Sequence, residues 1–124
     1  MTPWDKPLRR RGLVLLFAAA AAHAGGDAAR GEQAYEARCS GCHSVQADRI
    51  GPRHAGVLGR RAGSVPGFDY SPALQHSTIV WTAPLLERWL ADPEALIPGQ
   101  RMGYSVPDAA ARADIVAYLG TLKP

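Results

Sequence analysis

The segment CSGCH, residues 39–43, carries the side chains with the most distinctive chemistry in this chain. Cys39 and Cys42 are its two cysteines, and His43 directly follows the second. Two thiols and an imidazole at this spacing could bind zinc, form a redox-active disulfide or attach a haem. The surrounding sequence helps to choose between these three.

A zinc site or a disulfide explains the segment poorly. A structural zinc ion needs four ligands, usually from two separated pairs, and the sequence holds no second Cys/His pair. Cys42 and His43 are also neighbours, so their side chains cannot easily turn toward one tetrahedral centre. A thioredoxin-like site needs a strand-rich apolar run before Cys39, which is absent. A structural disulfide across so short a gap would constrain very little chain.

Covalent haem attachment uses all three side chains. The two thiols add to the two vinyl groups of one porphyrin, and His43 then lies under the iron as the proximal ligand. C-x-x-C-H is the attachment signature of c-type haem. A haem also gives a short chain apolar surface that its own side chains cannot supply. The segment therefore predicts one covalently attached haem c.

The second axial ligand of this haem is expected to be Met102. It is the only methionine apart from Met1, and it lies in a Pro/Gly-rich loop, residues 97–104. A thioether is a soft ligand that favours ferrous iron, and such a loop is a poor place for a core methionine. The alternative is a bis-histidine haem with His54 or His76. We expect His54 to pack near the proximal side and His76 to lie at the surface.

The first 24 residues are expected to be a secretory signal. Three arginines, residues 9–11, precede the apolar run Gly12–Ala22, and Ala22 to Ala24 offers small residues to a signal peptidase. The alternatives are an uncleaved anchor or an apolar helix of the domain, but the run is too short to span a membrane. Residues 1–24 are predicted to direct export to the bacterial periplasm. Residues 25–124 then form one domain.

Charge on the predicted domain is balanced. Ten basic and ten acidic residues follow Ala24, so the pI of about 9.2 reflects the signal. No basic patch interleaved with aromatic residues is present, which argues against nucleic-acid binding. We expect no stable membrane insertion after cleavage.

The elements that must position these side chains are expected to be helices joined by long loops. Capping residues and apolar spacing predict three helices: from about Asp27 to Cys39, from Thr82 to Asp92, and from Asp108 to Gly120. Residues 51–77 are rich in Gly and Pro and are predicted to be ordered loop. No alternating strand pattern follows the signal. The expected class is all-α.

With these residues in place, the chain resembles the class I cytochromes c, the group of mitochondrial cytochrome c and bacterial cytochrome c2. The resemblance runs from about Gly31 to Leu122 and rests on short motifs in the family's order. They are Gly31 with Tyr35, CSGCH at 39–43, Gly51-Pro52, Gly59-Arg60, GFDYS at 67–71, Trp81, PGQRM at 98–102 and DIVAYL at 114–119. The resemblance implies a cytochrome c fold, with three main helices and long loops around one covalently bound haem.

The resemblance also implies roles for residues around the haem. Pro52 matches the proline whose carbonyl accepts a hydrogen bond from the second ring nitrogen of the proximal histidine, here His43. Arg60, Tyr70 and Trp81 match residues that hydrogen-bond or neutralise the haem propionates. Buried propionates need such donors or a cation.

Four departures from the family's pattern concern the haem surroundings and docking. Trp89 stands where the family usually has a tyrosine near the methionine sulfur, Gln100 replaces a threonine, and Leu74 replaces a buried asparagine. Lys123 is the only lysine after residue 24, whereas the mitochondrial proteins carry many around the exposed haem edge. We therefore expect weak electrostatic steering and a partner recognised by a small apolar patch.

The expected function is that of a periplasmic monohaem electron carrier, not an enzyme. It would be a monomer that passes one electron at a time between a redox protein donor and acceptor, in a respiratory or related chain. One alternative is a dedicated electron-accepting subunit of a periplasmic dehydrogenase or oxidase complex. Another is a haem peroxidase or ligand-binding protein, which would need Met102 to stay off the iron.

Overall fold

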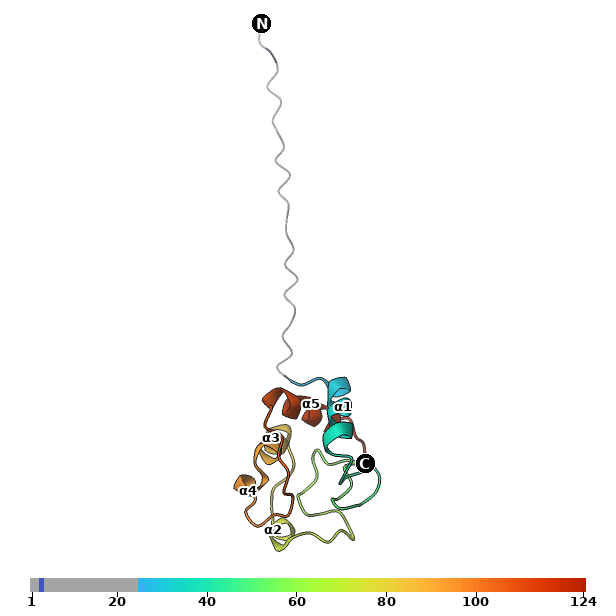
Figure 1. Cartoon of the computed structure of the whole chain (residues 1–124), viewed down its shortest axis with the longest axis vertical. Coiled ribbons are helices and arrows are strands. Elements are labelled where there is room, and N and C mark those ends of the chain that lie inside the picture. Colours follow the sequence, from blue (N-terminus) through green and yellow to red (C-terminus); the bar gives the residue numbers. More distant parts are fainter. Residues whose placement is uncertain (1–2, 4–24) are drawn as a thin grey trace.

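The computed structural model of the chain describes residue 3 and residues 25–124, so the predicted signal, apart from Pro3, lies outside the described part. Within this part the helices are α1 (Ala28–Arg38), α2 (Pro72–Gln75), α3 (Ala83–Ala91), α4 (Pro93–Leu96) and α5 (Ala109–Leu119), as Figure 1 shows. The described residues contain no β-strand, only an isolated antiparallel bridge between Arg61 and Val80. The prediction of an all-α domain is confirmed.

Side-chain caps begin the three longer helices, as the sequence predicts. Asp27, Thr82 and Asp108 each accept a hydrogen bond from a backbone N–H in the first turn of α1, α3 and α5. Each cap satisfies a backbone donor that has no partner inside its helix. The bounds of these helices agree with the prediction to within about two residues.

Two short helices lie beyond the three that the sequence predicts. The prediction of loop throughout residues 51–77 is wrong over α2, because Ser71 caps one helical turn and Pro72 takes its first position, where a missing N–H costs nothing. Asp92 ends α3 and also caps α4, with Pro93 as the first helical residue. One Asp-Pro pair therefore ends one helix and begins the next.

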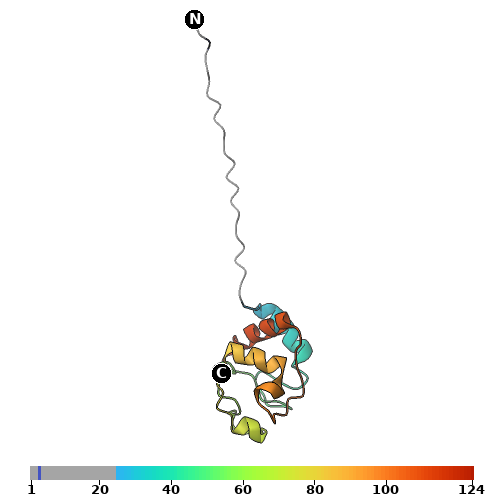
Figure 2. The same ribbon diagram turned by 90° about the vertical axis from the view of Figure 1, so that its left-hand side faces the viewer.

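Helices α1 and α5 pack together at one end of the domain, and α2 lies at the other (Figures 1 and 2). A Cβ on Gly31 of α1 would overlap the carbonyl of Asp114 and lie 2.9 Å from Cβ of Tyr118 in α5. Only glycine permits so close an approach. The Asp114 carboxylate fastens the pair, because it accepts hydrogen bonds from the Asp27 N–H (2.7 Å) and from Nε of Arg30 (3.0 Å).

The hydrophobic core draws side chains from α1, α3, α5 and the long loops. Tyr35, Val106 and Ile115 are its largest fully buried side chains. Cys39 and Met102 are partly buried and pack against this same core, although they are far apart in the sequence. The fold thus brings the attachment segment and the predicted second ligand to one apolar interior. In the part of the chain described, no helix combines the length and apolarity needed to cross a membrane.

Candidate functional site

The attachment segment follows α1 as one further helical turn. The backbone N–H groups of Cys42 and His43 both donate to the carbonyl of Cys39, at 3.1 and 2.9 Å. Residues three and four positions apart in such a turn lie on one side of it. Both thiols are free. The turn therefore brings the Cys42 thiol and the His43 imidazole each next to Cys39.

The surroundings of Cys39 differ from those of a redox-active cysteine. Its thiol is partly buried, and burial raises its pKa to about 11. Reactive cysteines in thioredoxin-like sites have a lowered pKa, because a helix N-terminus or a nearby positive charge stabilises the thiolate. Cys39 instead caps the C-terminal end of α1. Its position argues against the disulfide alternative.

The imidazole of His43 is held in the form that a metal ligand needs. Its Nδ1 lies 2.8 Å from the carbonyl oxygen of Pro52. Because a carbonyl only accepts, Nδ1 carries the proton and Nε2 keeps its lone pair. Burial lowers the pKa of His43, which favours the neutral ring. The structure therefore has the Pro52 carbonyl where the resemblance predicts it and leaves Nε2 available to a metal.

Gly51 shapes the site, although its motif draws attention to the neighbouring proline. A Cβ at residue 51 would overlap atoms of the His43 ring. The Gly51 N–H also donates to the carbonyl of Cys42 at 2.9 Å. The backbone therefore passes against the ring with no room for a side chain. In the sequence, the glycine directly before Pro52 is the signal that could have predicted this close approach of the backbone to the His43 ring.

His54 stacks on the His43 ring. The ring centroids are 4.1 Å apart, and the ring planes differ by 21°. Burial lowers the pKa of His54 to about 3, so its ring is neutral. A ring nearly parallel to the proximal imidazole at this distance lies on the same side of a haem, so His54 is not positioned to be the opposite ligand. His76, the other candidate for a bis-histidine haem, is exposed.

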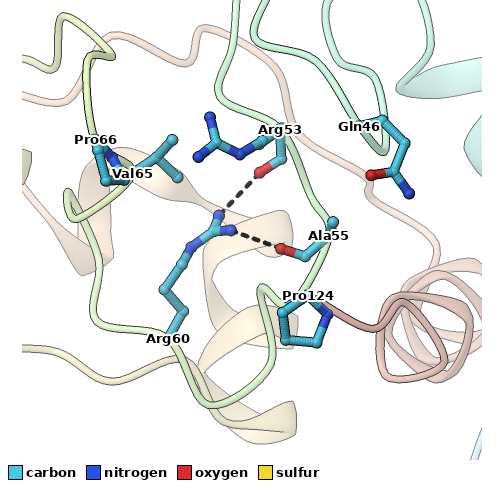
Figure 3. Close-up of a pocket in the computed structure, with 8 residues that line it drawn as sticks. Gln46, Arg53, Ala55, Arg60, Val65, Pro66 and Pro124 are labelled. Atoms are coloured by element: carbon cyan, nitrogen blue, oxygen red, sulfur yellow. Dashed lines mark hydrogen bonds between the residues drawn. The ribbon is translucent and has the colours of Figure 1, made fainter.

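Arg60 lines a cavity of about 440 Å³ (Figure 3). Its terminal nitrogens donate to the backbone carbonyls of Ala55 and Arg53, each at 3.0 Å. Arg53 lines the same cavity and pairs with Asp48, at 3.2 Å between nitrogen and oxygen. Arg53 is thus paired with a carboxylate, whereas the Arg60 hydrogen bonds go to neutral carbonyls, so the Arg60 charge suits an anionic group such as a carboxylate in this cavity.

Tyr70 and Trp81 are buried in the core, with 8% and 6% of their surface exposed. The Tyr70 hydroxyl accepts a hydrogen bond from the Val65 N–H at 3.0 Å, which leaves its own proton free to donate. The backbone N–H of Trp81 donates to the Arg60 carbonyl at 2.9 Å, so these two residues lie on adjoining segments. Trp89 of α3 packs edge to face on Trp81, with ring centroids 5.4 Å apart.

The loop that carries Met102 is fastened to α4 by Glu94. The two carboxylate oxygens of Glu94 accept hydrogen bonds from the Gly99 N–H at 2.9 Å and from Nε2 of Gln100 at 3.1 Å. Gln100 keeps its side-chain oxygen buried without a hydrogen-bond partner among the described residues. No motif marks Glu94, so its part in holding this loop is visible only in the structure.

The donor set as a whole fits a c-type haem. It combines two free thiols on one turn, a neutral imidazole with an available Nε2, and a methionine at the same core. Residues 28–123 match the protein-family model described as cytochrome c. The chain belongs to the cytochrome c family. Proteins of this family carry one covalently attached haem c and are electron carriers, not enzymes, so the predicted cofactor and class of function are confirmed.

Individual cytochromes c match nearly all of the described domain. The chain is 42% identical to cytochrome c2 of Rhodopila globiformis over 101 residues, which are 79% of this chain and 95% of the relative. The structure of cytochrome cH from Methylobacterium extorquens matches with a TM-score of 0.73 at 40% identity, covering 77% of this chain and 99% of that one. Ferricytochrome c2 from Rhodopseudomonas palustris matches with a TM-score of 0.74 at 36% identity, covering 78% and 99%. The predicted cytochrome c fold is therefore confirmed.

Proposed function

We propose that this cytochrome c is a periplasmic one-electron carrier whose haem is attached through Cys39 and Cys42 and ligated by His43 and Met102. The observation that carries the proposal is the 2.8 Å contact between Nδ1 of His43 and the Pro52 carbonyl, which leaves Nε2 free for iron. Met102 supports it because it packs against the same core as Cys39 and offers a soft sulfur ligand.

Each proposed ligand has a task that its surroundings allow. The haem iron supplies the one-electron exchange between its ferrous and ferric forms. Pro52 orients the His43 imidazole, and Glu94 fastens the loop of Met102, so both ligand atoms stay nearly fixed and reorganisation between the two states stays small. The methionine thioether favours ferrous iron and raises the reduction potential.

Arg60, Tyr70 and Trp81 are proposed to bind the haem propionates. The free hydroxyl proton of Tyr70 can donate to a carboxylate, and Arg60 brings a cation to the adjoining cavity. Buried carboxylates need partners of this kind, because an unpaired charge in a core is costly. Trp89 is proposed to pack beside the haem near the methionine sulfur, since it meets Trp81 edge to face.

Export to the periplasm is proposed from the sequence of residues 1–24, with their arginines, apolar run and small residues. The N-terminus of the protein isolated from the periplasmic fraction of a bacterial host tests this. A mature chain that begins close after Ala24 would support the proposal. A full-length chain retained in the membrane fraction would contradict it.

The carrier is proposed to work as a free monomer that docks on its partners through an apolar patch. Ile50, in the loop between His43 and Pro52, is 78% exposed, and Tyr104, two residues after Met102, is 44% exposed. With no net charge on residues 25–124, long-range steering should be weak. The electron-transfer rate should fall less than about threefold between roughly 10 mM and 150 mM salt. A steep fall would contradict this docking mode.

The test of the ligand set is an optical spectrum of the holoprotein, oxidised and reduced, extended to the near-infrared band that reports iron–methionine bonding. We expect this band in the ferric protein and its loss in Met102→Ala. His76→Ala, at an exposed position, is the matched control and should keep the band.

Other results would redirect the function. A high-spin or bis-histidine spectrum of the unmodified protein would overturn His/Met ligation and favour peroxide chemistry or ligand binding at iron. Purification of the carrier in stable association with a second polypeptide would favour a dedicated subunit of a periplasmic dehydrogenase or oxidase complex over a free shuttle.

A further inference from the structure

The stacked rings of His43 and His54 point to a task for His54 that rests on the proposed ligation of iron by His43. The two rings are nearly parallel, with centroids 4.1 Å apart and planes 21° from one another. The Pro52 carbonyl holds the His43 ring at one atom, Nδ1. Gly51 also meets this ring, where a Cβ would overlap Cε1 on the same edge. Contacts along one edge still let a ring tilt. A flat ring against its face restricts the plane as well.

His54 is itself held from behind by Tyr35. The Tyr35 side chain is 2% exposed, and its hydroxyl shares a 3.0 Å hydrogen bond with Nδ1 of His54. The two rings also meet edge to face, with centroids 5.6 Å apart. Tyr35 in turn packs against Tyr118 of α5, at 5.2 Å between centroids. A row of rings therefore runs from the pairing of α1 and α5 to the proximal imidazole.

Backbone hydrogen bonds keep the two histidine segments in register. The His54 N–H donates to the Ser44 carbonyl at 3.1 Å, and the Ala55 N–H donates to the Val45 carbonyl at 2.8 Å. Ser44 directly follows His43. The two segments therefore run side by side here, and neither ring can slide along the other without breaking these bonds.

Packing alone does not explain a histidine at residue 54. Burial of its polar ring costs free energy that an aliphatic side chain of similar size would not cost. The hydrogen bond with Tyr35 offsets part of this cost, at Nδ1. His54 gives this position a flat ring aligned with the proximal imidazole. An aliphatic side chain would provide no such flat face.

We infer that His54 is a positioning residue that sets the plane of the His43 imidazole, and that Tyr35 holds His54 for this task. The plane of an axial imidazole decides how unpaired spin in the ferric protein spreads over the porphyrin. Outer residues that orient a ligand in this way tune a metal site without touching the metal. The row of rings also ties the ligand plane to the pairing of α1 with α5.

Proton NMR of the ferric holoprotein tests the inference, because the shifts of the haem methyl groups depend on the ligand plane. His54→Leu removes the flat ring at similar volume, His54→Phe restores a flat ring, and Tyr35→Phe removes only the hydroxyl. We expect His54→Leu to change the spread of the methyl shifts and His54→Phe to restore most of the native pattern. Tyr35→Phe should give a smaller change in the same direction.

The control is His76→Leu, at an exposed position, which should leave the methyl shifts unchanged. If the haem methyl shifts of His54→Leu and Tyr35→Phe are as unchanged as those of this control, the inference is overturned. If His54→Leu does not fold, Tyr35→Phe still tests the inference, because it removes only one oxygen atom. Haem methyl shifts that stay unchanged in Tyr35→Phe would then overturn the inference. The near-infrared band separates the two proposals. Its absence from the unmodified protein would refute His/Met ligation, whereas a normal band with unchanged methyl shifts would refute only the task of His54.

Discussion

Gly51 lies against the imidazole ring of His43 so closely that a Cβ at residue 51 would overlap ring atoms. The next residue, Pro52, receives the hydrogen bond from Nδ1 of the same ring. Two consecutive residues therefore define where the imidazole lies, one by its missing side chain and the other by its carbonyl. This pair is the most direct structural support for His43 as a ligand.

Gly51→Ala should displace the His43 ring and lower the yield of protein with attached haem. We expect the free energy of unfolding to fall by roughly 1–3 kcal/mol, as for other overpacked sites. Chemical denaturation and the haem-to-protein ratio measure both effects. Gly41→Ala is the control, because a Cβ there meets nothing within 4 Å and the attachment signature leaves that position open. Equal behaviour of the two variants would contradict the role of Gly51.

Gly31→Ala should destabilise the domain, although the same change in an exposed helix usually stabilises it by about 0.5–1 kcal/mol. The reason is the pairing of α1 with α5, where a Cβ would overlap the Asp114 carbonyl. We expect the free energy of unfolding to fall by roughly 1–3 kcal/mol. Gln33→Ala, at an exposed position of the same helix, should change it by less than about 0.5 kcal/mol. A stabilised Gly31→Ala protein would show that the helices can separate without cost.

Stability in acid should depend on Asp114. Its hydrogen bond from Arg30 is the main cause that lowers its pKa below the ordinary value of 3.8, and the Asp27 N–H adds to this. A lowered pKa means that the carboxylate stabilises the fold at pH values above about 3.8 and that this contribution is lost as pH falls through the folded pKa. Asp114→Asn should therefore be less stable at neutral pH and lose less stability in acid.

Urea unfolding at a series of pH values measures this difference. Asp69→Asn is the control, since the Asp69 side chain is 93% exposed and lies 3.9 Å from its nearest cation. An Asp114→Asn protein whose stability follows the same pH curve as the unmodified protein would refute the prediction.

Glu94→Ala should loosen the loop that carries Met102. Loss of the hydrogen bonds to Gly99 and Gln100 removes the tie between this loop and α4. We expect imidazole from solution to replace Met102 in the ferric protein roughly 2–10-fold faster. Stopped-flow absorbance measures the rate. Glu87→Ala, at an exposed position of α3, should leave the rate unchanged, and an equal acceleration there would point to a general charge effect.

Features that depend on neighbouring residues could be predicted from the sequence alone. The C-x-x-C-H spacing predicts a covalent haem because the three side chains lie within one turn of chain. Asp27, Thr82 and Asp108 predict the helix starts, since a cap acts within three residues. The short helix α2 was missed because its single turn gives no periodic pattern, only a Ser71 cap and a proline.

Relationships between distant segments needed the tertiary structure. Nothing in the spacing of His43, His54 and Tyr35 says that the two imidazoles stack or that the tyrosine holds the outer ring. The tie from Glu94 to the loop of Met102 joins residues only five and six positions apart, but no motif marks it, so it too needed the structure. Chemistry between near neighbours depends on local residue order, so the sequence determined the cofactor and the three longer helices. The orientation of each ligand depends on contacts that exist only once the chain has folded, so the structure alone decided it.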